Sequence, residues 1–274
     1  MSELPRPFRA DDALDAMLYN QAEYWLYRAH VAGWDHGSAD GITWYHSGQR
    51  NTERNAVVRA HLPPEGNPVA MIAAARERVS PNGEPWTWWD PPPAVARLLP
   101  ETGLRLNSQD TGMAADLTQV PASVEAPAVL TVERVRDDAK ALTWRLAFRA
   151  ANELPLDIPT TREYIVEVLR GLAPAGYDER EPLRLYMAKL GGAPVAVAQL
   201  FTGAGVAGIY CVATLPQLRR QGIGAAVTHA ALADARALGY NMAVPGASQM
   251  GEPVYRRLGF VACGVLAEYV WESS

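Results

Sequence analysis

The most informative stretch of this 274-residue sequence is YCVATLPQLRRQGIGA, residues 210–225. Its apolar beginning predicts a buried strand, and its glycines predict the entry to a helix. Backbone N–H groups in the first turn of a helix lack partners within the helix and lie at the positive end of its dipole. Two arginines (Arg219, Arg220) add positive charge, and two glycines (Gly222, Gly224) allow close approach. We therefore expect a phosphate-bearing ligand at residues 219–225.

Two common phosphate-binding motifs do not fit this stretch. A Walker loop needs a lysine after its glycines, and none follows here. A dinucleotide fingerprint needs a small residue at position 227, where Val227 stands, and an acidic residue at the end of the next strand, which residues 241–246 lack. The alternative that the two glycines only ease the packing of the helix stays open.

The sequence around this stretch predicts strands that alternate with helices. The expected strands are residues 129–135, 183–190, 194–202, 206–213, 241–245 and 263–271, and the expected helices are residues 138–152, 161–172, 222–238 and 252–258. This order indicates the α/β class, with a mixed (α+β) sheet that carries helices on both faces.

Two motifs between residues 219 and 260 resemble a known family. Arg219-x-x-Gly222-x-Gly224 after a strand matches the Arg/Gln-x-x-Gly-x-Gly/Ala signature of the GNAT acyl-CoA N-acyltransferase superfamily. Downstream, SQMGEPVYRRLGF, residues 248–260, looks like that superfamily's closing helix and its Tyr-x-x-x-Gly-Phe ending. The chain is identified on these residues as a GNAT member over residues 129–271, which implies the GNAT fold.

The resemblance implies acetyl-CoA as cosubstrate, with no metal. Its pantetheine arm is expected to pair like an added strand with the backbone of Cys211, Val212 and Ala213. Its pyrophosphate is expected on the loop formed by Arg219, Arg220, Gln221, Gly222, Ile223, Gly224 and Ala225. Ser248 stands where relatives often carry a cofactor-contacting asparagine. Tyr255 matches the tyrosine that commonly protonates the departing CoA thiolate; the alternative is that Tyr255 only packs the last helix onto the sheet.

The implied activity is N-acetyl transfer, in a ternary complex, to a primary amine of a small molecule or peptide. A neutral amine attacks the thioester directly, so a base or a water chain must remove a proton. Residues 209–213 contain no carboxylate, although relatives often carry the base there. Glu153 and Asp157 are candidate bases, or else solvated loop acids. A non-catalytic acyl-CoA-binding regulatory protein is therefore the alternative function.

The composition excludes several other classes of protein. Hydrophobic residues make up 49% and the net charge is −5, which excludes a disordered chain and argues against a nucleic-acid partner. The two cysteines, Cys211 and Cys263, suggest neither a disulfide framework nor zinc. Residues 190–218 carry no charge but are broken by five glycines, so buried strands are expected there rather than a membrane span. We expect a cytoplasmic monomer or homodimer.

The length, at about 150 residues per domain, allows a second domain. A proline-containing linker at residues 117–127 predicts the domains 1–124 and 125–274. In the first half, residues 11–30 predict a helix, and PPAVARLLPETGL, residues 92–104, mimics residues 252–260. This half lacks Arg-x-x-Gly-x-Gly, so it looks like a degenerate GNAT module that does not hold CoA, in a tandem arrangement similar to some bacterial acetyltransferases. The alternatives are an unrelated helical cap for this half and, for the His/Trp-rich residues 33–41, either an aromatic-packed loop or part of an acceptor pocket.

Overall fold

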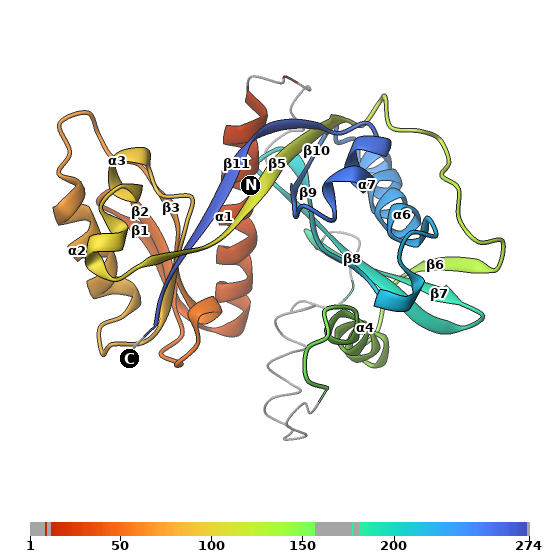
Figure 1. Ribbon diagram of the computed structural model, residues 1–274, viewed down its shortest axis with the longest axis horizontal. Helices are drawn as coiled ribbons and strands as arrows, with labels where there is room; N and C mark the ends of the chain where they lie inside the picture. Colours follow the sequence, from red (N-terminus) through yellow and green to blue (C-terminus); the bar gives the residue numbers. More distant parts are fainter. Residues whose placement is uncertain (1–8, 10–11, 157–176, 178–180, 273–274) are drawn as a thin grey trace. The chain divides into compact units, whose positions relative to one another are not determined.

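The computed structural model describes residues 9, 12–156, 177 and 181–272, which form two compact units (Figure 1). Unit 1 takes its residues from 1–20 and 112–263, and unit 2 from 21–111 and 264–274. Three elements contribute residues to both units: helix α1 (Ala13–Ala32), strand β5 (Arg105–Asp116) and strand β11 (Val261–Trp271).

Unit 1 is built on a mixed sheet with the strand order β5-β10-β9-β8-β7-β6. Its other strands are β6 (Leu130–Arg134), β7 (Leu183–Leu190), β8 (Ala193–Gly203), β9 (Val206–Thr214) and β10 (Met242–Ala247). Its helices are α4 (Asp138–Ala151), η4 (Pro216–Leu218), α6 (Ile223–Ala237) and α7 (Glu252–Arg257). Strands β6 to β9 are antiparallel, and β10 is parallel to β9. The predicted α/β class is confirmed; the expected helix 161–172 lies outside the described residues.

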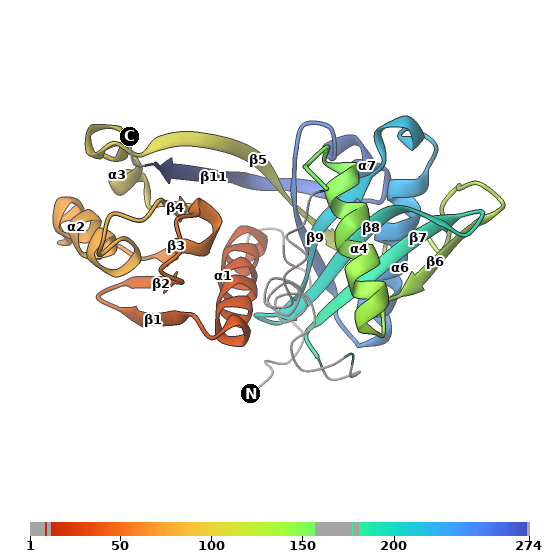
Figure 2. The same ribbon diagram turned by 90° about the horizontal axis from the view of Figure 1, so that it is seen from below.

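Helices α4 and α6 cover opposite faces of this sheet (Figure 2). Side chains of β7 and β8 alternate between the two apolar clusters: Val197 packs with α4, and its neighbours Ala196 and Ala198 pack with α6. Trp144 of α4 is fully buried, and its indole N–H donates to the carbonyl of Tyr186 at 2.9 Å. Burial on both faces explains why residues 190–218 carry no charge. Among the described residues, no helix has the length and apolar character of a membrane span.

Unit 2 has the strand order β1-β2-β3-β4-β11. Its elements are β1 (Asp35–Ala39), β2 (Ile42–His46), η2 (Thr52–Arg54), β3 (Asn55–Ala60), α2 (Pro68–Val79), β4 (Trp86–Trp89), α3 (Pro93–Ala96) and η3 (Leu99–Thr102). The expectation of a loop at residues 33–41 is wrong, because β1 pairs there with β2. The sequence DHGSA of β1 lies mostly in solvent and lacks the apolar alternation that reveals a half-buried strand.

The two halves of the chain repeat one order of elements. Each has a helix, three antiparallel strands, a second helix, a parallel strand and a short helix: α1-β1-β2-β3-α2-β4-α3 and α4-β7-β8-β9-α6-β10-α7. The short helical segment of the first half, α3 with η3, and that of the second half, α7, are each followed by a left-handed glycine, Gly103 (φ 86°) and Gly259 (φ 91°). The residue after each glycine donates its N–H to a carbonyl five residues back, at 3.1 Å in both cases. This repeat supports the proposal that the first half is a second copy of the same module.

The last strand of each half completes the sheet of the other. Strand β5 is the last strand of the first half but neighbours β10 of the second half. Strand β11 is the last strand of the second half but pairs with β4 of the first half, with Glu268 opposite Trp89. The compact units therefore do not correspond to a single division of the chain. Residues 112–116 of the first half belong to unit 1, and residues 264–271 of the second half belong to unit 2. The division into modules 1–124 and 125–274 remains a proposal about ancestry and ligand binding.

Asp90, directly after β4, is half-buried and has a left-handed backbone conformation (φ 46°). Its Oδ1 accepts the backbone N–H of Ala267 at 2.6 Å, and its Oδ2 accepts Nε2 of Gln21 at 3.3 Å. Burial raises the pKa of Asp90 to about 6, although these hydrogen bonds oppose the rise. Since the folded pKa lies above the unfolded value of 3.8, the ionised side chain lowers stability above about pH 6, and this cost disappears below about pH 4.

Replacing Asp90 by asparagine therefore predicts a pH-dependent gain in stability. Asp90→Asn keeps the shape of the side chain and an oxygen for Ala267. We expect its free energy of unfolding to exceed that of wild type by about 3 kcal/mol at pH 8 and to come close to it near pH 4, from the rise of the pKa from 3.8 to about 6 at about 1.4 kcal/mol per pKa unit. Urea unfolding at the two pH values measures the difference. Asp35→Asn on the exposed strand β1 is the control, and a variant no more stable than wild type at pH 8 contradicts the prediction.

Candidate functional site

Strand β9 separates from its parallel neighbour β10 in mid-course. The pairing joins Ala207, Gly208 and Ile209 to residues 243–245 and ends there, whereas β9 continues to Thr214. The last partner on β10 is Pro245, which has no N–H to donate. In the register of the described strands, residues 211–213 thus have a partner on β8 only at Ala213 and none on β10. A strand edge of this kind can bind an extended ligand arm by backbone hydrogen bonds.

A β-bulge marks the point where β9 leaves β10. On the other side of β9, Tyr210 pairs with Gln199 and Ala213 with Val197, so that Cys211 and Val212 together oppose one residue of β8. Cys211 has a φ of 51°, which is rare for a residue with a side chain. Bulges bend a strand and increase its twist. The residues predicted to pair with a pantetheine arm therefore lie on the bent end of β9.

The start of α6 provides backbone N–H groups for an anion. The first backbone bond of the helix runs from Ala226 N to Gly222 O at 2.9 Å, so the N–H groups of Ile223, Gly224 and Ala225 precede it. Among the described residues, no side chain caps this end of the helix. The preceding Arg220 is exposed, and both Arg220 (φ 67°) and Gly222 (φ 80°) have a left-handed backbone conformation. The residues present therefore fit a phosphate group, because turns of this kind direct several N–H groups to one side.

The structure gives three residues of this loop a structural role that the sequence did not reveal. Arg219 donates through Nε to the carbonyl of Thr214 at 3.1 Å and through a terminal nitrogen to that of Ala151 at 2.8 Å, which ties the loop to β9 and α4. A Cβ on Gly222 would lie 2.2 Å from the carbonyl oxygen of Glu125, and one on Gly224 would lie 3.2 Å from Thr214 Oγ1. Both glycines thus admit neighbouring protein atoms, and their contact with an anion remains a prediction.

The corresponding helix of unit 2 has its N-terminus occupied. The side chain of Asn67 accepts the N–H groups of Val69 and Ala70, and Pro68 at the first position has no N–H. Since these are the groups that would bind a phosphate, the start of α2 does not offer the site that α6 offers.

Tyr255 and Ser248 lie on either side of Gly251. A Cβ on Gly251 would lie 3.4 Å from Ser248 Oγ and 3.5 Å from the ring of Tyr255. The Ser248 hydroxyl accepts the N–H of Gly251 at 3.2 Å, and the Tyr255 ring is buried against Phe260 in an edge-to-face contact. These contacts fit the packing role of Tyr255, and its role as a proton donor remains a prediction.

The structure describes only one of the two candidate bases, Glu153. Glu153 is exposed just after α4 and has a φ of 56°. Asp157 lies outside the described residues. The sequence-based search also missed two polar residues that the fold brings together, Asn20 and Tyr210, whose side chains bond at 2.7 Å. No local pattern reveals this pair, because 190 positions separate its members.

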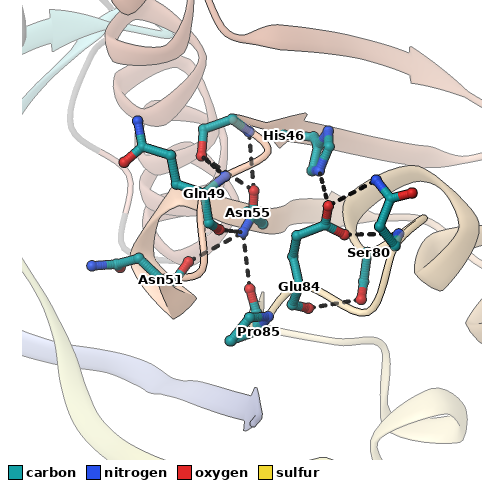
Figure 3. Close-up of polar contacts among 9 residues, drawn as sticks. His46, Gln49, Asn51, Asn55, Ser80, Glu84 and Pro85 are labelled. Atoms are coloured by element: carbon teal, nitrogen blue, oxygen red, sulfur yellow. Dashed lines mark hydrogen bonds and ion pairs between the residues drawn. The ribbon is translucent and has the colours of Figure 1, made fainter. Parts of the chain in front are cut away.

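A second polar cluster lies in unit 2 and connects loops at the end of β2 and the start of β4 (Figure 3). Asn55 is fully buried; its Nδ2 donates to the carbonyls of Gln49, Asn51 and Pro85. Beside it, Glu84 accepts two N–H groups of Asn82 and lies 3.6 Å from His46 Nε2. Burial opposes the ionisation of Glu84, but the hydrogen bonds prevail and lower its pKa to about 2. These contacts hold the loops around Asn55 and Glu84 in place. Among the described residues, no group of three or more His, Cys, Asp or Glu side chains could hold a metal ion.

Comparisons with known proteins agree with the features of unit 1. Residues 150–260 match the family model described as the acetyltransferase (GNAT) family. No curated protein matches the chain. Among solved structures, a GCN5-related N-acetyltransferase from Kribbella flavida has a TM-score of 0.67 at 18% identity, covering 93% of this chain and 96% of the other. A GCN5-related N-acetyltransferase from Sphaerobacter thermophilus has a TM-score of 0.59 at 16% identity, covering 98% and 97%. A tandem GNAT protein from the clavulanic acid biosynthesis pathway has 0.57 at 15% identity, covering 100% and 99%.

The close contact at Gly222 predicts that a side chain at this position lowers the stability of the protein by more than its backbone strain alone would. Gly239, at the other end of α6, has a φ of 90°, but a Cβ there would meet nothing within 4 Å. Gly239→Ala should lose about 1 kcal/mol of stability from the left-handed conformation alone. Gly222→Ala should lose clearly more, because its Cβ must displace the backbone at Glu125. Urea unfolding of both variants compares the two losses, and equal losses would rule out a clash at Gly222.

Proposed function

We propose, on the premise that the C-terminal half of this chain is a GNAT acetyltransferase domain, that the protein transfers the acetyl group of acetyl-CoA to a primary amine of a small molecule or peptide. One observation carries this proposal: the end of β9 that has left β10 is followed, after residues 215–222, by the uncapped start of α6. A single extended ligand with a phosphate end and an amide-containing arm matches both features.

The binding mode follows from the order of these residues along the chain. The pyrophosphate binds the N–H groups at residues 223–225, and Arg220 supplies positive charge from the surface. The amide groups of the pantetheine arm pair with the backbone of residues 211–213. Arg219 holds the loop between these two parts through its bonds to Thr214 and Ala151.

Acetyl-CoA supplies an acetyl thioester, which a neutral amine can attack. The new C–N bond forms as the C–S bond breaks, and the amine passes a proton to a base or a water chain. Tyr255 donates its proton to the departing thiolate. The location of Tyr255 beside Gly251 and Ser248, the residue that replaces the family's asparagine, supports this role.

A non-catalytic acyl-CoA-binding protein is the second candidate function. The observation that favours it is the lack of a carboxylate in residues 206–214 of β9. Such a protein would bind acetyl-CoA as tightly as an enzyme does and would release no thiol with any amine. We also propose that the first half of the chain binds no CoA, since Asn67 and Pro68 occupy the start of α2.

Charge reversal at the phosphate loop tests cofactor binding. Arg220→Glu should raise the dissociation constant of acetyl-CoA, measured by isothermal titration calorimetry, about tenfold or more, because it places a negative charge beside the pyrophosphate. Arg97→Glu makes the same change at an exposed position of the short helical region of unit 2 and should leave the constant unchanged. Failure of the wild type to bind acetyl-CoA at micromolar concentration would contradict the proposed function.

The role of Tyr255 is tested by removing its hydroxyl. Tyr255→Phe keeps the ring against Phe260, so we expect normal folding and an acetyl-CoA affinity within about twofold of wild type. Turnover, followed by thiol release, should fall about tenfold or more, because the thiolate must then leave without a proton. Equal turnover in both proteins across pH 6–9 would leave Tyr255 with its packing role alone.

A further inference from the structure

The last residue of β9, Thr214, places a hydroxyl beside the start of α6. A Cβ on Gly224, in the first turn of that helix, would lie 3.2 Å from Thr214 Oγ1. Apart from the helix itself and the residues next to Gly224, no other atom of the described residues lies within 4 Å of that place. The hydroxyl therefore borders an open space at the first turn of α6.

The alternation of side chains along β9 directs this hydroxyl toward α6. Val212 packs in the apolar cluster on the α6 side of the sheet, and Ala213 in the cluster on the α4 side. Successive side chains of a strand point to opposite faces, so Thr214 shares the α6 side with Val212. Arg219 fixes the backbone at this point, because it donates to the carbonyls of Thr214 and Ala151 at 3.1 and 2.8 Å.

The Thr214 hydroxyl is not used within the described part of the chain. Its side chain is half-buried, and it does not cap α6. A second threonine near Gly224 behaves differently, since Thr228 donates its hydroxyl to the Gly224 carbonyl at 2.8 Å. A hydroxyl carries one donor and two lone pairs and can rotate to suit its partner. The O–H of Thr214 is thus available to a ligand that enters the space beside Gly224.

The first half of the chain lacks this hydroxyl. Strand β3 corresponds to β9 in the repeat of elements, and its last residue is Ala60. At the start of α2, the side chain of Asn67 already accepts the N–H groups of Val69 and Ala70. The half that we propose to bind no CoA therefore lacks both the free N–H groups and the hydroxyl beside them.

Thr214 lies between the two parts of the proposed cofactor site. In the proposed binding mode, the pantetheine arm follows residues 211–213 and the pyrophosphate binds the N–H groups of residues 223–225. Thr214 directly follows the first group along the chain and lies beside Gly224 of the second group in space. A phosphate oxygen at these N–H groups is an acceptor for a further donor, and hydrogen bonds to charged groups are stronger than neutral ones.

We infer that Thr214 is a further cofactor-binding residue, whose hydroxyl donates a hydrogen bond to the pyrophosphate of acetyl-CoA where the phosphate meets the pantetheine arm. The inference rests on the proposed function. It also gives Gly224 a second reason to lack a side chain, since a Cβ there would crowd the hydroxyl that binds the phosphate.

Isothermal titration calorimetry of Thr214→Val with acetyl-CoA tests the inference. Valine keeps the shape of the side chain, so the urea midpoint of unfolding should stay at the wild-type value, while the dissociation constant should rise about tenfold. Thr214→Ser restores the hydroxyl and should bring the constant back to within about threefold of wild type. Thr131→Val, at an exposed position of strand β6, is the matched control and should leave the constant unchanged. If Thr214→Val does not fold, Thr214→Ala takes its place.

The nucleotide half of CoA, 3′-phospho-ADP, tests whether the hydroxyl binds the phosphate end. It keeps the pyrophosphate and lacks the arm, so Thr214→Val should weaken its binding by about the same factor as that of acetyl-CoA. An effect on acetyl-CoA alone, or a wild type that binds acetyl-CoA but no 3′-phospho-ADP at millimolar concentration, overturns the assignment to the pyrophosphate. Equal acetyl-CoA affinity in wild type and Thr214→Val, or no recovery in Thr214→Ser, overturns the inference and leaves the proposed function standing. A wild type that does not bind acetyl-CoA overturns both.

Discussion

The separation of β9 from β10 after Ile209 is the constraint on which the rest of the site depends. Pro245 ends the pairing on one side, and the bulge at Cys211 bends β9 on the other. A regular parallel pair would use the backbone groups of residues 211–213 within the sheet and leave none for a ligand. The separation frees this edge of β9 shortly before the chain turns through η4 into the uncapped start of α6. The arm and the phosphate of the proposed ligand would therefore find adjacent binding groups.

The repeat within the chain indicates which residues the proposed site depends on. Unit 2 has the same order of elements and the same parallel pair, yet Asn67 caps α2 where α6 has Gly222. In its short helical segment, Leu99 accepts the backbone bond that Tyr255 accepts in the other half. The fold alone therefore does not make the site, which depends on a few positions at the ends of its elements. The exchange of β5 and β11 gives each unit a strand from the other half, so the first half, which we propose to be an altered copy, still completes the sheet of unit 1.

Much of unit 1 could be predicted because its signals are local. Glycines mark the β7–β8 and β8–β9 turns, and the predicted strand 183–190 has the observed bounds. Strand β1 was missed because its exposed residues leave no apolar pattern. The strand exchange and the Asn20–Tyr210 bond were missed for another reason: both join residues far apart in the chain, and no short window of sequence contains them. The contact that requires a glycine at position 222 could not be predicted for the same reason. The carbonyl of Glu125, which occupies the place of a side chain there, lies about a hundred positions away in the sequence.

Hydrogen–deuterium exchange with and without acetyl-CoA tests most directly whether the ligand binds along β9 and the start of α6. Bound ligand should slow exchange at the N–H groups of residues 211–213 and 223–225, because backbone hydrogen bonds to the arm and the phosphate protect them. The equivalent start of α2, residues 69–71, should exchange equally fast in both samples, since Asn67 already caps that helix. Protection at α2, or unchanged exchange at both strand β9 and helix α6 under saturating acetyl-CoA, would contradict this assignment of the site.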